Sequence, residues 1–182
     1  MGKKSALLVI DVQVNVVKDA YNRDRVLDNI HTLLARARAS GTLVMYVQHE
    51  SRVGDGLEAG TPGWEIHPAI SPCPGEPVVQ KHACDSFHQT SLQQELEQHG
   101  IEHLIVVGAQ TDYCVGTSVR RATTCGYDVA LVSDAHTTED NEILTAEQVI
   151  AYHSHLLNGF RTNSNTITVK PTSEITFSSL EA

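Results

Sequence analysis

The sequence lacks any long apolar run. Its longest runs, residues 6–10 and 43–47, are far shorter than the roughly 20 residues that a membrane-spanning helix needs, and we expect no export signal. Runs rich in lysine and arginine are also absent, and 22 acidic residues outnumber 13 basic ones, giving a formal net charge of -9. Surfaces that bind nucleic acids need concentrated positive charge. We therefore expect a cytoplasmic protein that binds neither membranes nor nucleic acids.

Cysteine is scarce as well. The four cysteines, Cys73, Cys84, Cys114 and Cys125, form no C-x-x-C pair and no zinc-like spacing. Reduced thiols in a cytosolic chain fit this usage better than a disulfide framework does. A hydrophobic content of 41% over 182 residues is enough for a core without crosslinks. We expect residues 1–182 to form a single domain.

Short apolar runs alternate with amphipathic segments along the chain. The runs are too apolar for half-exposed antiparallel strands and predict buried parallel strands at 6–10, 42–47, 103–107, 128–133 and 167–170. Helical periodicity lies between them, at 24–40, 91–99, 113–125 and 145–160. This alternation predicts a three-layer α/β/α fold with a doubly wound, mainly parallel sheet. Ligands of such folds bind beyond the carboxyl ends of the strands, so functional residues are expected directly after each strand.

One long segment, residues 51–77, has no regular pattern. It is rich in glycine and proline, which interrupt helices and strands. Long loops in compact domains are often functional. We expect this loop to border the pocket.

Two chemically versatile residues follow predicted strands. Asp11 ends the first strand, where a helix cap or a turn residue would be equally ordinary. Cys114 follows the third strand and is predicted to lie in the first turn of a helix. Unpaired N–H groups and the helix dipole at that position would lower the pKa of a thiol from about 8.5 and would also hold an oxyanion. The competing interpretation is a small core residue, which is the usual role of a free cysteine.

Three motifs together resemble the isochorismatase-like cysteine hydrolase superfamily. They are D-x-Q beginning at Asp11, Lys81 followed by S-F-x-x-T at 86–90, and G-x-x-T-D-x-C-V at 108–115. Lys81 alone would be interpreted as a solvated charge. The resemblance covers roughly residues 5–170 and implies an Asp-Lys-Cys triad, with Asp11 as acid and base, Lys81 as the orienting cation and Cys114 as the nucleophile.

The resemblance also implies a reaction. Cys114 would attack the carbonyl carbon of an amide-type C–N bond, and water would hydrolyse the resulting thioester. The backbone N–H groups of Gln110 and Cys114 would form the oxyanion hole, next to a cis peptide bond between Ala109 and Gln110. The implied partner is a small-molecule substrate, and superfamily members commonly form homo-oligomers, so we expect a dimer or tetramer.

The metal-binding members of the superfamily carry Asp-x-His after the second strand, where this chain has Q-H-E at 48–50. We therefore predict no catalytic metal and no cofactor. A rival Cys-His mechanism or a metal site stays open through the loop histidines His49, His67, His82 and His88, although none of them has ligand spacing.

The candidate pocket residues lie in strand-end loops or beside the nucleophile, and each is equally expected to serve in packing. They are His49, Trp64, Phe87, Gln110 and Tyr113. Members specialised for vinyl ethers can lack the cysteine, so its presence favours amide-type substrates. Two alternatives stay open: ether hydrolysis of an isochorismate-like acid with Asp11 as the acid, and a catalytically silent protein that only binds a small molecule.

Overall fold

The computed structural model describes residues 3–177. Its six strands form one sheet in the order β3-β2-β1-β4-β5-β6, and every neighbouring pair is parallel. The strands are β1 (Ser5–Ile10), β2 (Leu43–His49), β3 (Val78–Lys81), β4 (His103–Ala109), β5 (Asp128–Thr137) and β6 (Ile167–Lys170). The α-helices are α1 (Arg23–Ala39), α2 (Leu92–Gln98), α3 (Gly116–Thr124) and α4 (Ala146–Leu157). Short helical turns occur at η1 (Pro68–Ile70), η2 (Thr111–Val115, a π-helical turn) and η3 (Thr172–Glu174).

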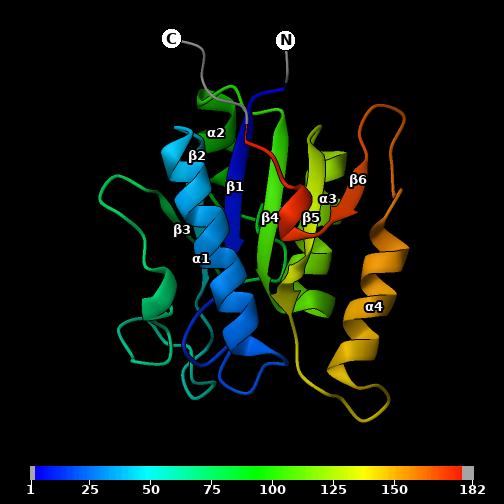
Figure 1. Ribbon diagram of the computed structural model, residues 1–182. Coiled ribbons are helices and arrows are strands. Elements are labelled where there is room, and N and C mark those ends of the chain that lie inside the picture. Colours follow the sequence, from blue (N-terminus) through cyan, green and yellow to red (C-terminus); the bar gives the residue numbers. More distant parts are fainter. Residues whose placement is uncertain (1–2, 178–182) are drawn as a thin grey trace.

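The central strand β1 is buried on both of its faces. Leu7 and Val9 belong to the apolar cluster that includes α1, whereas Leu8 and Ile10 belong to the cluster that includes α2 and α3. Successive side chains of a strand point to opposite faces of the sheet, so a strand covered twice has a continuous apolar sequence. Helices thus lie on both faces (Figure 1), and the predicted three-layer α/β/α fold is confirmed.

The structure differs from the predicted elements in three places. β3 was not predicted, because its side chains alternate between exposed and buried and one of the buried ones is the charged Lys81. β5 continues to Thr137, beyond the predicted end at residue 133, because its pairing with β4 resumes after a register shift. The helix predicted at 113–125 is divided into η2 and α3.

The loop of residues 51–77 is irregular, as predicted, apart from η1. Its middle part runs beside the segment that follows β1, where backbone hydrogen bonds join Val14 to Glu65 and Asn15 to Gly63, at 2.9 and 3.0 Å. Near its end, Glu76 accepts hydrogen bonds of 2.8 and 2.9 Å from the guanidinium of Arg38 on α1. These contacts place the middle of the loop beside the segment after the carboxyl end of β1, and its last residues beside the last turn of α1, near the start of β3.

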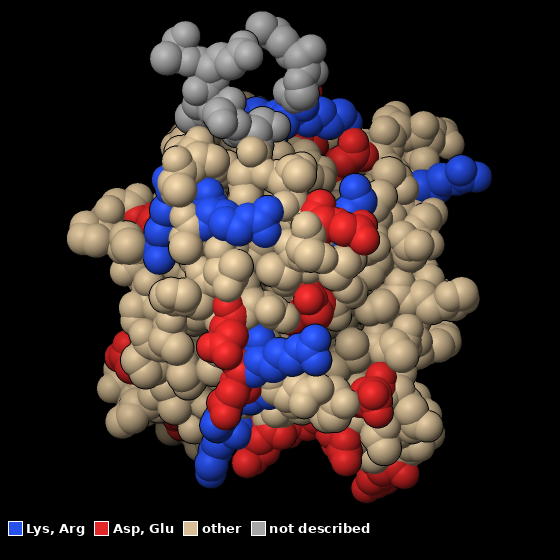
Figure 2. All heavy atoms as spheres, in the orientation of Figure 1, with Lys and Arg blue, Asp and Glu red and all other residues tan. Residues whose placement is uncertain are grey.

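The surface carries charges of both signs. On the described part of the face in Figure 2, basic and acidic side chains are interspersed with uncharged ones, and acidic groups gather along the lower edge. This face therefore presents no continuous basic surface. Among residues 3–177, no helix combines the length and the apolar character that crossing a membrane requires.

Candidate functional site

Three strand ends bring Asp11, Lys81 and Cys114 together. Asp11 follows β1, Lys81 is the last residue of β3, and Cys114 lies in η2 directly after β4. Lys81 Nζ lies 2.6 Å from Asp11 Oδ2, and the two side chains are 0% and 1% exposed. The Sγ atom of Cys114 lies within 4.8 Å of a carboxylate oxygen of Asp11. The three residues of the implied triad are therefore neighbours in the structure.

The close approach of β4 to β1 depends on Gly108. This residue pairs with Ile10 and has a φ of 130°, a conformation that side chains rarely adopt. A Cβ atom on Gly108 would lie 2.0 Å from the carbonyl oxygen of Ile10, which is well inside contact distance. Glycine therefore allows the nucleophile segment to leave β4 beside Asp11.

Burial and charge together set the ionisation of the Asp11–Lys81 pair. Burial raises the pKa of Asp11, and the positive charge of Lys81 opposes that shift. Burial also disfavours the charged form of Lys81, but attraction to Asp11 and then to Cys114 outweighs it, so the pKa of Lys81 is raised. Lys81 is therefore an ammonium at neutral pH and stabilises Asp11 as a carboxylate.

The predicted lowering of the Cys114 pKa is wrong. Burial, followed by the negative charge of Asp11, raises the pKa of this thiol, and Lys81 offsets the rise only in part. The regular helix α3 begins at Gly116, so Cys114 lies in the π-helical turn before it and not in the first turn of an α-helix. The resting group is therefore a thiol, which needs a base when it attacks.

Two side-chain contacts from the end of β5 hold the nucleophile turn η2. The Thr111 hydroxyl lies 2.8 Å from Nδ1 of His136, and the Thr138 hydroxyl donates to Asp112 at 2.6 Å. Burial lowers the pKa of His136 to about 4, so its ring is neutral at neutral pH. Neither His136 nor Thr138 was a sequence candidate, because nothing in the pattern near them indicates a partner about 25 residues away.

The backbone before Cys114 has an unusual arrangement. The peptide bond between Ala109 and Gln110 is cis, at the position that the resemblance implies. The Gln110 carbonyl accepts hydrogen bonds from the N–H groups of Tyr113 and Val115, at 3.2 and 3.1 Å. Within the described residues, the backbone N–H of Gln110 donates to no other group. It is therefore available to an anionic oxygen.

His49, the last residue of β2, also reaches the triad. Its Nδ1 lies 3.4 Å from Lys81 Nζ, and a ring nitrogen lies within 4.8 Å of Asp11 and of Cys114 Sγ. The Gln13 side chain holds the backbone of His49 at both groups, accepting from its N–H at 2.8 Å and donating to its carbonyl at 2.9 Å. Burial lowers the pKa of His49, and the charge of Lys81 lowers it further. Gln13 is the last residue of the D-x-Q motif, so the motif was the one sign in the sequence that Gln13 belongs to the site.

The other candidate pocket residues have different surroundings. Trp64 is half-buried, and its carbonyl accepts a hydrogen bond of 2.7 Å from Gln13. Phe87 is 8% exposed and packs in the core, with its ring centroid 6.0 Å from that of Tyr127. Tyr113 is 58% exposed. Phe87 therefore serves in packing, the alternative that the sequence left open, whereas Tyr113 is accessible to a ligand.

A hollow of about 360 Å³ opens beside the triad. It is lined by His49, Glu50, Ser51, Arg52, Asp55 and His82. His49 both lines this hollow and reaches Cys114, so it is the residue that links the hollow to the nucleophile. Of the other loop histidines, His67 accepts the Ala69 N–H at 3.3 Å and His88 is exposed.

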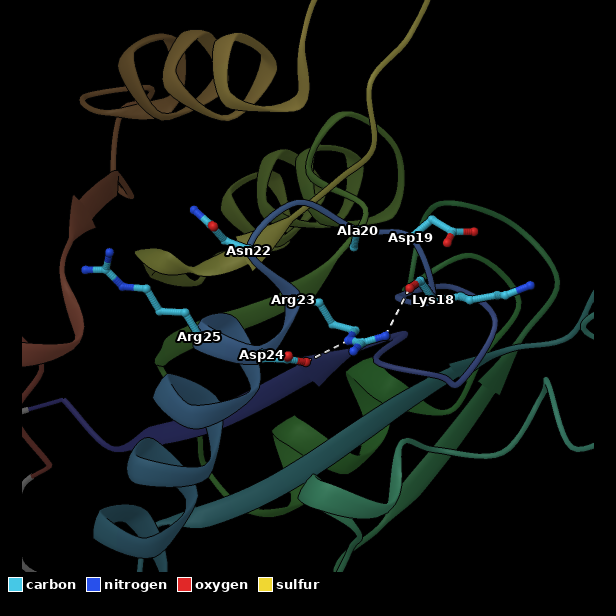
Figure 3. Close-up of a pocket in the computed structure, with 7 residues that line it drawn as sticks. All are labelled: Lys18, Asp19, Ala20, Asn22, Arg23, Asp24 and Arg25. Carbon is cyan, nitrogen blue, oxygen red and sulfur yellow. Dashed lines mark hydrogen bonds and ion pairs between the residues drawn. The ribbon is translucent and has the colours of Figure 1, made fainter.

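A second hollow, of about 440 Å³, lies at the start of α1 (Figure 3). It is lined by residues 18–20 and 22–25, and Arg23 there donates to the Lys18 carbonyl and to Asp24, at 3.1 and 2.8 Å. Its lining residues include neither a member of the triad nor His49, which reaches Cys114. The hollow beside His49 is therefore the better candidate for substrate entry.

Asp11, His49 and Cys114 also have the donor atoms for a metal ion. Their oxygen, nitrogen and sulfur atoms all lie within 4.8 Å of one another. The Lys81 ammonium, 2.6 Å from Asp11, adds a positive charge that disfavours a second cation there. The absence of a catalytic metal stays a prediction.

Comparisons with known proteins give a consistent result. A family model described as the isochorismatase domain matches residues 5–161. Streptothricin hydrolase of Streptomyces noursei is 41% identical over 74% of this chain, and the match spans 50% of that relative's length. Ureidoacrylate amidohydrolase RutB of Cronobacter sakazakii is 25% identical over 73% of this chain and 74% of its own. A solved isochorismatase structure from Pseudomonas putida KT2440 has a TM-score of 0.87 at 29% identity, covering 95% of this chain and 90% of that one.

Proposed function

The chain belongs to the isochorismatase family, and on that basis we propose that it is a cysteine hydrolase that cleaves an amide-type C–N bond of a small molecule through a thioester on Cys114. The observation that carries this proposal is the buried ion pair between Lys81 and Asp11, 2.6 Å long, beside the Cys114 thiol. A buried carboxylate held by a buried ammonium next to a thiol is costly to maintain as packing alone. It is the arrangement that proton transfer from the thiol requires.

The first half of the reaction uses all three residues. Asp11 takes the thiol proton as Cys114 Sγ attacks the carbonyl carbon, and Lys81 holds the carboxylate in position. Because the pKa of Cys114 is raised, the thiolate forms only as the attack proceeds. Asp11 then gives the proton to the leaving nitrogen, the C–N bond breaks, and the acyl group remains on sulfur.

The charge that develops on the carbonyl oxygen also needs donors. The backbone N–H of Gln110, which has no other acceptor within residues 3–177, and that of Cys114 would hold this oxygen. Among the relatives, the ureidoacrylate amidohydrolase supports a C–N bond as the substrate class. Two expectations belong to the proposal: a homo-oligomeric assembly and no catalytic metal.

Intact mass spectrometry during turnover tests this function. The protein is incubated with a panel of small amides, with and without a chelator, and the acyl adduct on Cys114 is followed. We expect an adduct that is unaffected by the chelator and is absent from Cys114→Ala and Asp11→Asn. The exposed Cys73 supplies a matched control, because Cys73→Ala should form the adduct as the wild type does.

Two results would contradict the proposal. If Cys114→Ala turns over a vinyl ether substrate while no amide gives an adduct, the ether hydrolase replaces the covalent mechanism. If an amide binds without any adduct or product, the chain is a binding protein that retains the pocket.

A further inference from the structure

The residues around Cys114 differ in their access to solvent. Asp11 and Lys81 are 1% and 0% exposed, whereas His49 is half-buried and also lines the hollow of about 360 Å³. Of the residues clustered at Cys114, His49 lines this hollow, whereas Asp11 does not. His49 therefore connects the solvent-facing side of the site with the nucleophile.

The position of His49 is fixed by its neighbours. The buried side chain of Gln13 binds the N–H and the carbonyl of His49. In the sheet, His49 on β2 pairs with Lys81 on β3. Its Nδ1 is 3.4 Å from Lys81 Nζ. The ammonium has closer partners, since it lies 2.6 Å from Asp11 Oδ2 and donates to the Ala83 carbonyl at 2.9 Å. The imidazole is thus held at the site. The charge of Lys81 is balanced by Asp11, so His49 has no part in that ion pair.

Burial, together with the positive charge of Lys81, keeps the His49 ring neutral. Burial lowers its pKa first, the positive charge of Lys81 and the neighbouring His82 act in the same direction, and Asp11 and the Ala83 carbonyl oppose them. The net shift is downward from the usual value of 6.5. At neutral pH the ring therefore has a lone pair that can accept a proton.

We propose that His49 is a further catalytic residue, which accepts the proton of the water that hydrolyses the thioester. This inference rests on the proposed function. As the water oxygen attacks the thioester carbonyl, one O–H proton moves to the imidazole. The tetrahedral intermediate then expels the Cys114 thiolate by breaking the C–S bond, and the imidazolium returns its proton to sulfur. The products are a carboxylic acid, the thiol and the neutral ring.

The division of labour between Asp11 and His49 follows from burial. During acylation the proton comes from the thiol, which is beside Asp11. During hydrolysis the proton comes from water, and His49 is the residue of the cluster that lines the solvent-facing hollow. Asp11 thus acts as the base in acylation, where the proton comes from the buried thiol. His49 acts as the base in hydrolysis, where the proton comes from water.

Burst kinetics with p-nitrophenyl acetate separate these two steps. The release of nitrophenolate in the burst reports acylation, and the later steady rate reports hydrolysis of the acetyl thioester. We expect His49→Gln to keep the burst rate within about threefold but to lower the steady rate by about 10²–10⁴-fold, the usual contribution of general base catalysis. Hydroxylamine, which attacks thioesters without a base, should discharge the trapped acetyl group from this variant as fast as from the wild type.

Matched variants keep the test decisive. His88→Gln, at an exposed histidine outside the cluster, should retain both rates, and His49→Asn should repeat the His49→Gln result. Equal losses of burst and steady rate in both His49 variants, or an unchanged steady rate, would overturn the role of His49. A wild-type burst that persists in Cys114→Ala would instead overturn the proposed function and, with it, this inference.

Discussion

Two regions of the molecule contrast: the strand ends that carry Asp11 and Lys81 beside Cys114, and the loop of residues 51–77. The strand side is closed to solvent, with Asp11 and Lys81 1% and 0% exposed and their charges balanced within the pair. The loop side is open, and Val53 on it is 94% exposed. The hollow beside His49 lies where the two regions meet, because it is lined by His49 from β2 and by the first residues of the loop.

The two regions also differ in how they are fixed. Asp11 follows β1, which pairs with both β2 and β4, so a shift there disturbs three strands of a close-packed core. The loop is attached through a few hydrogen bonds to the segment after β1, and the residues between these attachments are open to change. We infer that the strand side determines the chemistry and that the loop side determines which substrates reach it.

The largest effect on stability is expected from breaking the buried ion pair between Asp11 and Lys81, which tests the strand side. Lys81→Met leaves the Asp11 carboxylate buried without a cation, so the free energy of unfolding should fall by about 3–5 kcal/mol. Urea denaturation at pH 7 measures this loss. The double variant Asp11→Asn/Lys81→Met removes both charges and should recover most of the stability, but neither variant should form an acyl adduct.

A lysine on the surface provides the control for this experiment. Lys170→Met, at the exposed end of β6, should change stability by less than about 0.5 kcal/mol. Equal losses in the single and double Lys81 variants would mean that side-chain volume, and not charge, explains the result.

Acid should destabilise the strand side through His136. The pKa of this buried ring is lowered from 6.5 to about 4, so between these pH values the unfolded chain binds a proton that the folded chain does not. Stability therefore falls as the pH falls, by about 3 kcal/mol at pH 4. In His136→Asn the loss of unfolding free energy between pH 7 and pH 4 should be smaller than in the wild type by about that amount.

His67 on the loop side is the matched comparison for His136. Burial also lowers its pKa, with a smaller contribution from Arg23, but its ring is only partly buried. His67→Asn should therefore change the pH dependence of stability less than His136→Asn does. If the two substitutions change the pH dependence of stability equally, the strand side and the loop side do not differ in their sensitivity to acid.

The sequence predicted the strand side better than the loop side, for a physical reason. Strands buried on both faces, such as β1, have continuous apolar sequences that are visible without the structure. β3 was missed because Val78 and Gln80 are exposed and Lys81 points inward, so its sequence has no apolar run. The grouping of Asp11, Lys81 and Cys114 came from motifs and not from periodicity, and the structure places these side chains together.

The remaining features of the site depend on contacts between distant segments. Gln13 and His136 act through partners about 36 and 25 residues away, which no local pattern reveals. The raised pKa of Cys114 was missed for a similar reason, since it arises from burial by the folded chain and from Asp11. A strand end can be located from sequence, but the surroundings of the side chain it carries cannot.

The smallest effect is expected from removing the hydrogen bond by which Gln13 attaches the loop. This change tests most directly whether the chemistry is independent of the loop. Gln13 is fully buried, and its side chain makes three hydrogen bonds, two with His49 and one with the Trp64 carbonyl. Gln13→Leu removes this partner from the N–H and the carbonyl of His49 and leaves the Trp64 carbonyl with only its 3.0 Å bond from Gln48, at a cost of about 1–3 kcal/mol. We expect faster amide hydrogen exchange in residues 63–67, with the p-nitrophenyl acetate burst within about threefold of the wild type.

Asn15→Ala is the control for that change, because it removes a single exposed hydrogen bond from the same segment to Gly56. Exchange in residues 63–67 should rise less in Asn15→Ala than in Gln13→Leu. If Gln13→Leu instead abolishes the burst, the loop attachment and the acylation chemistry are one unit. The strand ends would then depend on the loop for their geometry, and the separation of chemistry from substrate access would be wrong.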